Sequence, residues 1–140
     1  MTLFDSSVII DARDERSPWH KWAVAQIKHF ASTEGAAVNV IVLAEVSIRA
    51  ENPETVNQEL SAWGMELLPL PVSAAGPAAK AYASYLARRD KALPKTPQPD
   101  FFVGAHAQAE GLKLVTRDPA RLKTYFPAVK LIVPQEQAEN

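Results

Sequence analysis

The sequence contains no cysteine. This excludes a disulfide framework, a thiolate zinc site and a cysteine nucleophile. An excess of one charge is also missing, because 15 lysines and arginines stand against 16 aspartates and glutamates, which gives a net charge of −1. The composition therefore carries no global signature of nucleic-acid binding. A polyanionic partner would need a local basic surface, or metal ions held by acidic residues.

Long apolar stretches are absent as well. No run approaches the roughly 20 residues that are needed to cross a bilayer. The first residues also lack a basic region followed by an apolar one, so they do not resemble a signal peptide. We therefore expect a cytoplasmic protein that does not associate with membranes.

What is present is typical of a soluble globular protein. The chain has 140 residues, of which 47% are hydrophobic and 22% are charged. A chain of this length can bury roughly two thirds of its unfolded surface in one core. We expect a single domain over residues 1–134, followed by a polar tail over residues 135–140.

Strand-like and helix-like segments alternate along the chain. Apolar segments typical of strands end at Phe4 and cover 37–41, 65–68, 112–116 and 129–133. Helical spacing covers 18–30, 42–50, 54–63, 73–89 and 100–110, and a short helix begins at Asp118-Pro119. This alternation predicts an α/β domain with a mostly parallel sheet and helices on both faces. In such folds, ligands bind beyond the carboxyl ends of the strands, at a topological switch point.

Four acidic residues fall at or just beyond those predicted strand ends. Asp5 follows the first strand, and Asp118 follows the fourth in the segment LVTRD. Glu45, in VLAEV, lies on the helix directly after the second strand, and Asp100 opens the helix that leads into the fourth. Three other acids do not share this placement: Asp11, Asp14 and Asp90.

Each of these acids also has a purely structural explanation. Asp100 and Asp118 are good N-caps, Asp5 can form an Asx-turn, and Glu45 can be the solvated edge of an amphipathic helix. Those roles do not explain why all four share one placement. Clustered carboxylates need cations, and Mg²⁺ is often held by one or two carboxylates together with waters and substrate phosphates. A pair of such ions can promote cleavage of a phosphodiester bond.

Three segments resemble the PIN-domain ribonucleases, and specifically the VapC toxins of bacterial type II (VapBC) toxin–antitoxin pairs. They are LFDSSVIID, LAEV and PDFFVGAHAQAEGLKLVTRDPARLKTYFP, and the resemblance covers nearly the whole chain. It implies a three-layer α/β/α fold with a central parallel sheet of about five strands. It also implies an endoribonuclease that depends on Mg²⁺ or Mn²⁺ and hydrolyses phosphodiester bonds in tRNA or rRNA.

The resemblance assigns roles to individual residues. Asp5 and Asp100 would be the main metal ligands, and Asp118 and Glu45 would complete the acidic cluster directly or through water. The hydroxyl groups of two residues would give polar support near the site: Ser7 and Thr116. Gly104 stands where the family more often has alanine, a difference that affects packing and not the acids.

The resemblance also implies an RNA substrate, a cognate VapB-type antitoxin and a homodimer. A hydrophobic groove for the antitoxin would be formed by residues of the early helices and the end of a later one: Trp19, Trp22, Ala44, Ile48 and Trp63. Arg117 is a candidate RNA contact because it neighbours Asp118. The other basic residues near the predicted site could either contact phosphates or be solvated charges near helix ends: Arg88, Arg89, Lys91, Lys95, Arg121 and Lys123. We assign no role to His106.

Competing enzyme classes fit less well. A haloacid-dehalogenase-type phosphatase would need an acid two residues after Asp5, where Ser7 stands. A phospho-receiver domain would need an aspartate after the third strand, where the sequence reads LPLP. The alternative that stays open is a catalytically inactive PIN-like binding module, whose acids act only as structural caps.

Overall fold

The fold is built on one five-stranded parallel sheet. A computed structural model describes residues 1–48 and 52–135. Its strands are β1 (Thr2–Phe4), β2 (Ala36–Asn39), β3 (Met65–Leu68), β4 (Lys113–Val115) and β5 (Leu131–Ile132). They are ordered β3-β2-β1-β4-β5, so the chain begins in the centre of the sheet and fills first one side and then the other. This reversal puts the topological switch point between β1 and β4.

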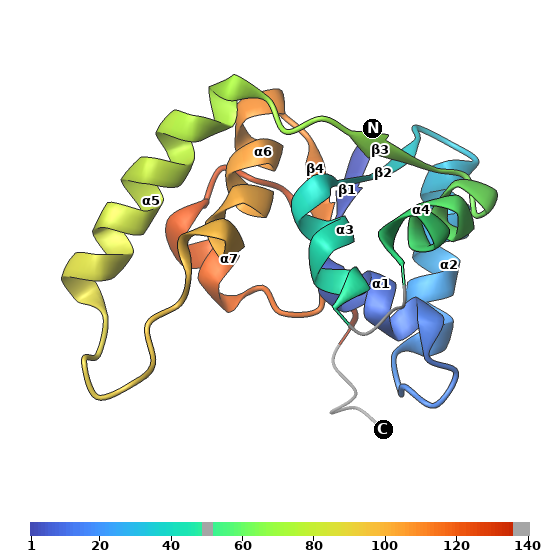
Figure 1. Cartoon of the computed structure of the whole chain (residues 1–140), viewed down its shortest axis with the longest axis horizontal. Helices are drawn as coiled ribbons and strands as arrows, with labels where there is room; N and C mark the ends of the chain where they lie inside the picture. Colours follow the sequence, from blue (N-terminus) through green and yellow to red (C-terminus); the bar gives the residue numbers. More distant parts are fainter. Residues whose placement is uncertain (49–51, 136–140) are drawn as a thin grey trace.

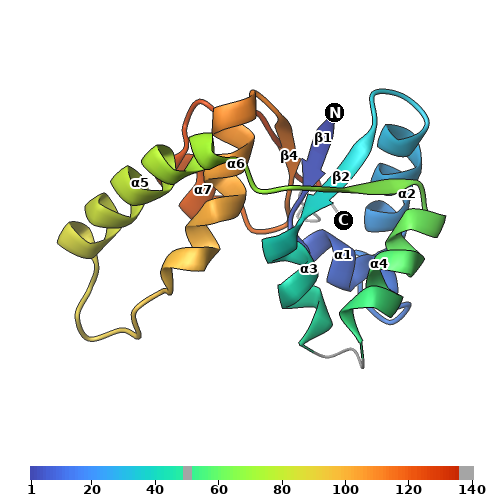
Figure 2. The same cartoon turned by 45° about the horizontal axis from the view of Figure 1, so that its top comes forward.

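Helices cover both faces of this sheet. In the described part of the chain they are α1 (Ser6–Arg13), α2 (His20–Ala31), α3 (Val40–Ser47), α4 (Pro53–Ala62), α5 (Ala75–Arg88), α6 (Phe102–Glu110) and α7 (Ala120–Tyr125), with short 3₁₀ turns at Val72–Ala74 and Gln98–Phe101. Helices α1, α2 and α4 lie to one side of the strands, and α5, α6 and α7 lie to the other (Figures 1 and 2). The predicted α/β architecture with a parallel sheet of five strands is therefore confirmed.

The core lies where these helices meet the central strands. Every residue of β1 and β2 is buried, as expected for parallel strands that are covered on both faces. Three of the largest fully buried side chains are phenylalanines from different elements: Phe4, Phe101 and Phe126. The sheet is therefore a rigid base from which the loops at its carboxyl edge project.

The sequence pattern did not predict helix α1, which begins directly after Asp5. The Asp5 carboxylate caps it by accepting a hydrogen bond from the Ser6 N–H at 2.8 Å. The β-branched run Val8-Ile9-Ile10 has modest helix propensity, but Val8 and Ile9 are fully buried. Packing therefore outweighs propensity in this segment.

Two other helices begin away from their predicted starts. Helix α2 starts at His20 instead of Pro18. The Ser17 hydroxyl accepts the Trp19 N–H at 3.1 Å, and Pro18 and Trp19 therefore form a turn before the helix. Helix α3 starts at Val40, two residues early, because Asn39 caps it. The last two residues of the predicted 42–50 helix, and the predicted tail after Gln135, lie outside the described residues.

Gly104 allows α6 and α7 to pack closely together. A Cβ atom at this position would collide with the Phe126 ring and would lie 2.9 Å from Leu122 Cδ2. The missing side chain thus brings α7 against α6, close to Asp100. Gly111 ends α6 in the left-handed conformation, with φ of 65°, as the sequence predicts for its C′ position.

Candidate active site

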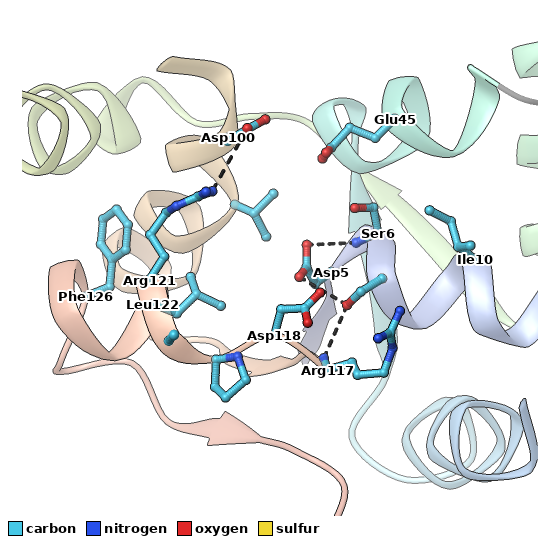
Figure 3. A pocket seen from close by; sticks show the side chains of 14 residues that line it. Asp5, Ser6, Ile10, Glu45, Asp100, Arg117, Asp118, Arg121, Leu122 and Phe126 are labelled. Atoms are coloured by element: carbon cyan, nitrogen blue, oxygen red, sulfur yellow. Dashed lines mark hydrogen bonds and ion pairs between the residues drawn. The ribbon is translucent and has the colours of Figure 1, made fainter. Parts of the chain in front are cut away.

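One pocket of about 700 Å³ lies at the carboxyl edge of the sheet. Helices α1 and α3 form one of its walls, and α6 and α7 form the other (Figure 3). All four acids that the sequence places at strand ends line it: Asp5, Glu45, Asp100 and Asp118. Four separate chain segments therefore bring carboxylates to one pocket at the switch point.

Asp5 is the most firmly held of these acids. Its backbone N–H donates to the Val115 carbonyl at 2.9 Å, which ties the end of β1 to the end of β4. Its Oδ1 accepts the Ser6 N–H, and its Oδ2 accepts hydrogen bonds from Thr116 Oγ1 at 2.8 Å and Ser7 Oγ at 3.3 Å. Because a carboxylate has about four acceptor positions, this arrangement leaves one for a further ligand.

The two hydroxyl groups connect Asp5 to the loop that carries Asp118. Ser7 Oγ accepts the Arg117 N–H at 3.2 Å, and Thr116 Oγ1 accepts the Asp118 N–H at 3.1 Å. Each hydroxyl therefore accepts a backbone N–H of this loop and donates its proton to Asp5. The structure thus places both residues that the sequence suggested as polar support, Ser7 and Thr116, in contact with Asp5.

Two carboxyl groups in the pocket, those of Asp5 and Glu45, have raised pKa values. Burial raises the pKa of Asp5, against its three hydrogen bonds, and the charge of Asp118 adds to the effect. Burial also raises the pKa of Glu45 to about 7, and the charges of Asp5 and Asp100 add to the shift. A bound cation would offset this repulsion.

The donor set of the pocket fits a hard divalent cation. It offers carboxylate oxygens and no thiolate, which suits Mg²⁺ or Mn²⁺. Within residues 1–48 and 52–135, no group of three or more acidic or histidine side chains is arranged so that it could hold a metal ion. Such an ion would therefore be held by a few carboxylates and water, an arrangement typical of Mg²⁺.

Helix capping accounts for only one of the acids. Asp5 caps α1, but α6 begins after Phe101 and α7 begins after Pro119, and neither start has a side-chain cap. Asp118 is instead exposed, and Asp100 lies half-buried beside Arg121. The sequence-based interpretation of Asp100 and Asp118 as N-caps is therefore wrong.

Arg117 is held at the side of the pocket by an acid that sequence reasoning set apart from the site. Its Nε donates to Oδ2 of the buried Asp11 at 2.6 Å, and Asp11 Oδ1 accepts from Ser17 Oγ at 2.9 Å. Asp11 lies four residues after Ser7, on the same face of α1. A contact between Arg117 and RNA stays a prediction, and it would have to use the guanidinium N–H groups other than Nε.

His106 links α6 to the start of α3. It is fully buried, and its Nδ1 lies 3.1 Å from Asn39 Nδ2. Because the amide nitrogen only donates, Nδ1 is the acceptor and the neutral ring carries its proton on Nε2. Burial lowers the pKa of His106. Sequence reasoning missed this pair, although an asparagine just before a helix is itself a capping signal.

The proposed antitoxin groove is only partly assembled. A second pocket, of about 400 Å³, lies between α1, α2 and α4 and is lined by Ala12, Val24, Ile27, Lys28, Ala62 and Trp63. Of the five predicted groove residues, Trp63 lines it. Trp19 and Trp22 are half-buried near the start of α2. Ala44 is exposed on α3, and Ile48 is exposed directly after the end of α3.

No helix in the described part of the chain is both long and apolar enough to span a bilayer.

Comparison with known proteins identifies the fold. A family model of the PIN domain matches residues 2–126. Comparison with curated proteins finds no match. Among solved structures, VapBC2 from Rickettsia felis, bound to a promoter DNA fragment, has a TM-score of 0.69 at 17% identity, covering 94% of this chain and 97% of that chain.

Two further structures show the same fold. A toxin–antitoxin complex from Klebsiella pneumoniae has a TM-score of 0.67 at 20% identity, and the match covers 97% of this chain and 99% of that one. VapC20 from Mycobacterium tuberculosis, a toxin that cleaves the sarcin–ricin loop, has a TM-score of 0.52 at 16% identity. The match covers 81% of this chain and 85% of VapC20. At these identities the similarity establishes the fold alone.

Proposed function

Because the chain belongs to the PIN-domain family, we propose that it is a metal-dependent endoribonuclease and the VapC-type toxin of a toxin–antitoxin pair. The observation that carries this proposal is the convergence of Asp5, Glu45, Asp100 and Asp118 on one pocket at the switch point of the sheet. These acids come from four different segments, and Asp100 and Asp118 have no capping role. A binding module would not need such a set of charges.

The residues of the pocket divide the proposed chemistry between them. Asp5 and Asp100 would hold Mg²⁺ or Mn²⁺, with Asp118 as a further ligand directly or through water. A bound divalent ion would supply a Lewis acid for the activation of water and the stabilisation of the leaving oxygen. Glu45, which lines the same pocket, would act as the general base that takes a proton from the attacking water.

The proposed substrate is tRNA or rRNA, hydrolysed in the cytoplasm. VapC20, which shares the fold, is described as a toxin that cleaves the sarcin–ricin loop, and this supports an RNA substrate. The structures from Rickettsia felis and Klebsiella pneumoniae are toxin–antitoxin complexes, and they support a VapB-type partner. A homodimer is proposed on family resemblance.

The activity can be tested with the purified chain, free of any partner, and total bacterial RNA. The reactions contain Mg²⁺, Mn²⁺ or EDTA, and Asp100→Asn is the control because Asp100 caps no helix. We expect discrete fragments that require metal and disappear in the variant. If a folded protein produces no fragments and binds no Mn²⁺, the inactive binding module is the better description.

The pocket at Trp63 offers a separate test of the antitoxin partner. Trp63→Ala removes a large aromatic anchor, and such residues commonly contribute about 2 kcal/mol or more at interfaces. We therefore expect it to weaken binding of a co-purified VapB-type partner by roughly 30-fold in calorimetry. Val72→Ala is the matched control, because Val72 is 92% exposed and does not line this pocket. Equal affinities for the two variants would place the partner elsewhere.

A further inference from the structure

Arg121 occupies a distinctive position in the acidic pocket. Its Nη1 lies 4.0 Å from Asp100 Oδ2, and Figure 3 shows the guanidinium directed at that carboxylate. Its Cζ lies 5.5 Å from the centroid of the Phe101 ring, and its Nη2 donates to Thr96 Oγ1 at 3.3 Å. The Arg121 side chain is therefore directed from α7 toward Asp100, the metal-ligand candidate in the 3₁₀ turn that precedes α6.

The charges around the pocket single out Arg121. Two arginines line the pocket, and Arg117 is paired with Asp11, which is not part of the lining. Arg121 is thus the lining arginine whose ion-pair partner is itself a pocket acid. Its charge also reaches Glu45, across the pocket. Arg121 therefore acts as a counter-ion for the acidic set.

The ion pair between Arg121 and Asp100 is weak enough for a metal ion to replace Arg121 as the partner of Asp100. The two side chains are 42% and 34% exposed, and ion pairs of this kind contribute only about 0–1 kcal/mol. A divalent cation that coordinates the Asp100 carboxylate would replace the Arg121 guanidinium as its partner and would repel that group. The released group is a planar set of N–H donors that matches the oxygens of a phosphate.

We propose that Arg121 neutralises Asp100 in the metal-free protein and contacts a phosphate of bound RNA once a metal occupies that carboxylate. This inference rests on the proposed ribonuclease function. It predicts opposite effects of one substitution on two ligands: losing Arg121 should strengthen metal binding and weaken RNA binding. A residue with a purely structural role would weaken both.

The metal arm compares Arg121→Gln and Arg121→Lys with the wild type by Mn²⁺ titration calorimetry without RNA. The glutamine variant removes the competing charge, so its Mn²⁺ affinity should rise by about two- to fivefold, the equivalent of one exposed ion pair. The lysine variant keeps the charge and should bind Mn²⁺ like the wild type. Weaker Mn²⁺ binding by the glutamine variant would overturn the inference.

The RNA arm uses fluorescence anisotropy of a labelled single-stranded RNA with Mn²⁺ present. All proteins carry Glu45→Gln, which slows cleavage and leaves Asp5 and Asp100 in place. Arg121→Gln should lower RNA affinity by about tenfold and reduce the salt slope by about 0.7, the value for one phosphate contact. Arg121→Lys should recover most of the affinity, because a point charge still binds a phosphate.

Arg16→Gln is the matched control, because Arg16 is 94% exposed and pairs with Asp14 away from the pocket. It should leave both affinities unchanged, and thermal unfolding verifies that each variant folds. RNA affinity equal to the wild type in Arg121→Gln would overturn the inference while leaving the function intact. A wild-type chain that binds neither Mn²⁺ nor RNA would overturn the function, and this inference with it.

Discussion

Replacing Asp5 with asparagine is expected to reduce metal-dependent RNA cleavage by more than about 100-fold, with the fold intact. Substituting a residue that only supports a metal ligand already costs about 10- to 100-fold, and Asp5 is proposed as a ligand itself. Asparagine is as good an N-cap as aspartate, so the Ser6 N–H keeps its acceptor and α1 keeps its start. Initial rates on an RNA fragment, together with thermal unfolding, measure the two effects separately.

The stability of the Asp5 variant should not fall in the absence of metal. Burial raises the pKa of Asp5, so the ionised carboxylate is unfavourable at its position. The neutral amide removes that charge, while the hydroxyls of Ser7 and Thr116 can rotate to accept its N–H groups. Asp5→Ala provides the contrast, because it also removes the cap and should cost about 1 kcal/mol.

Asp14→Asn is the matched control for Asp5→Asn. Asp14 is also an aspartate at an end of α1, but it lies at the opposite end and pairs with Arg16 outside the pocket. Its variant should cleave RNA at the wild-type rate. If Asp5→Asn retained activity within a few-fold of wild type, Asp5 would be a cap and not a ligand.

The positions of the acids could be predicted from the sequence because they follow from topology. In a parallel sheet the carboxyl ends of the strands share one edge, so residues after β1 and β4 must meet there. Locating the two short apolar segments that form β1 and β4 was therefore sufficient to predict where Asp5 and Asp118 lie. Glu45 and Asp100 followed from the helices beside those strands. These statements require no knowledge of side-chain packing.

The side-chain contacts could not be predicted in the same way. Asp11, the partner of Arg117, lies on helix α1. The β-branched run Val8-Ile9-Ile10 has low helix propensity, so the sequence did not predict this helix, which forms because Val8 and Ile9 are buried. The pair formed by Asn39 and His106 joins residues that are 67 positions apart. Nothing local in the sequence marks such a pair, since its geometry depends on how α6 packs against the end of β2 and the start of α3.

The pH dependence of metal binding should report on Glu45. The pKa of Glu45 is raised from 4.5 to about 7, so at pH 6 most of the metal-free molecules have a protonated Glu45. A metal ion that binds to this carboxyl group must displace the proton. We expect the apparent Mn²⁺ affinity to rise by up to about tenfold per pH unit below pH 7 and to level off above it. Calorimetry from pH 5.5 to 8.5 measures this, and Glu45→Gln should flatten the curve.

The same carboxyl group gives the metal-free protein a pH-dependent stability of defined sign. Because the pKa of Glu45 is raised on folding, its contribution is fully present below about pH 4.5 and is lost as the pH rises toward 7. His106 acts in the opposite direction, because burial lowers its pKa and its contribution is lost as the pH falls below about 6.5. Both the wild type and Glu45→Gln contain His106, so its contribution cancels when the unfolding free energies of the two proteins are subtracted.

That difference in unfolding free energy should grow from near zero at pH 4.5 to its full size at pH 7, with the glutamine variant the more stable at the higher pH. Saturating Mn²⁺ should reverse the order at pH 7, because the ion stabilises the ionised wild type more than it stabilises the amide. If Mn²⁺ stabilised both proteins equally at every pH, Glu45 would lie outside the metal site, and its raised pKa would reflect burial and its acidic neighbours alone.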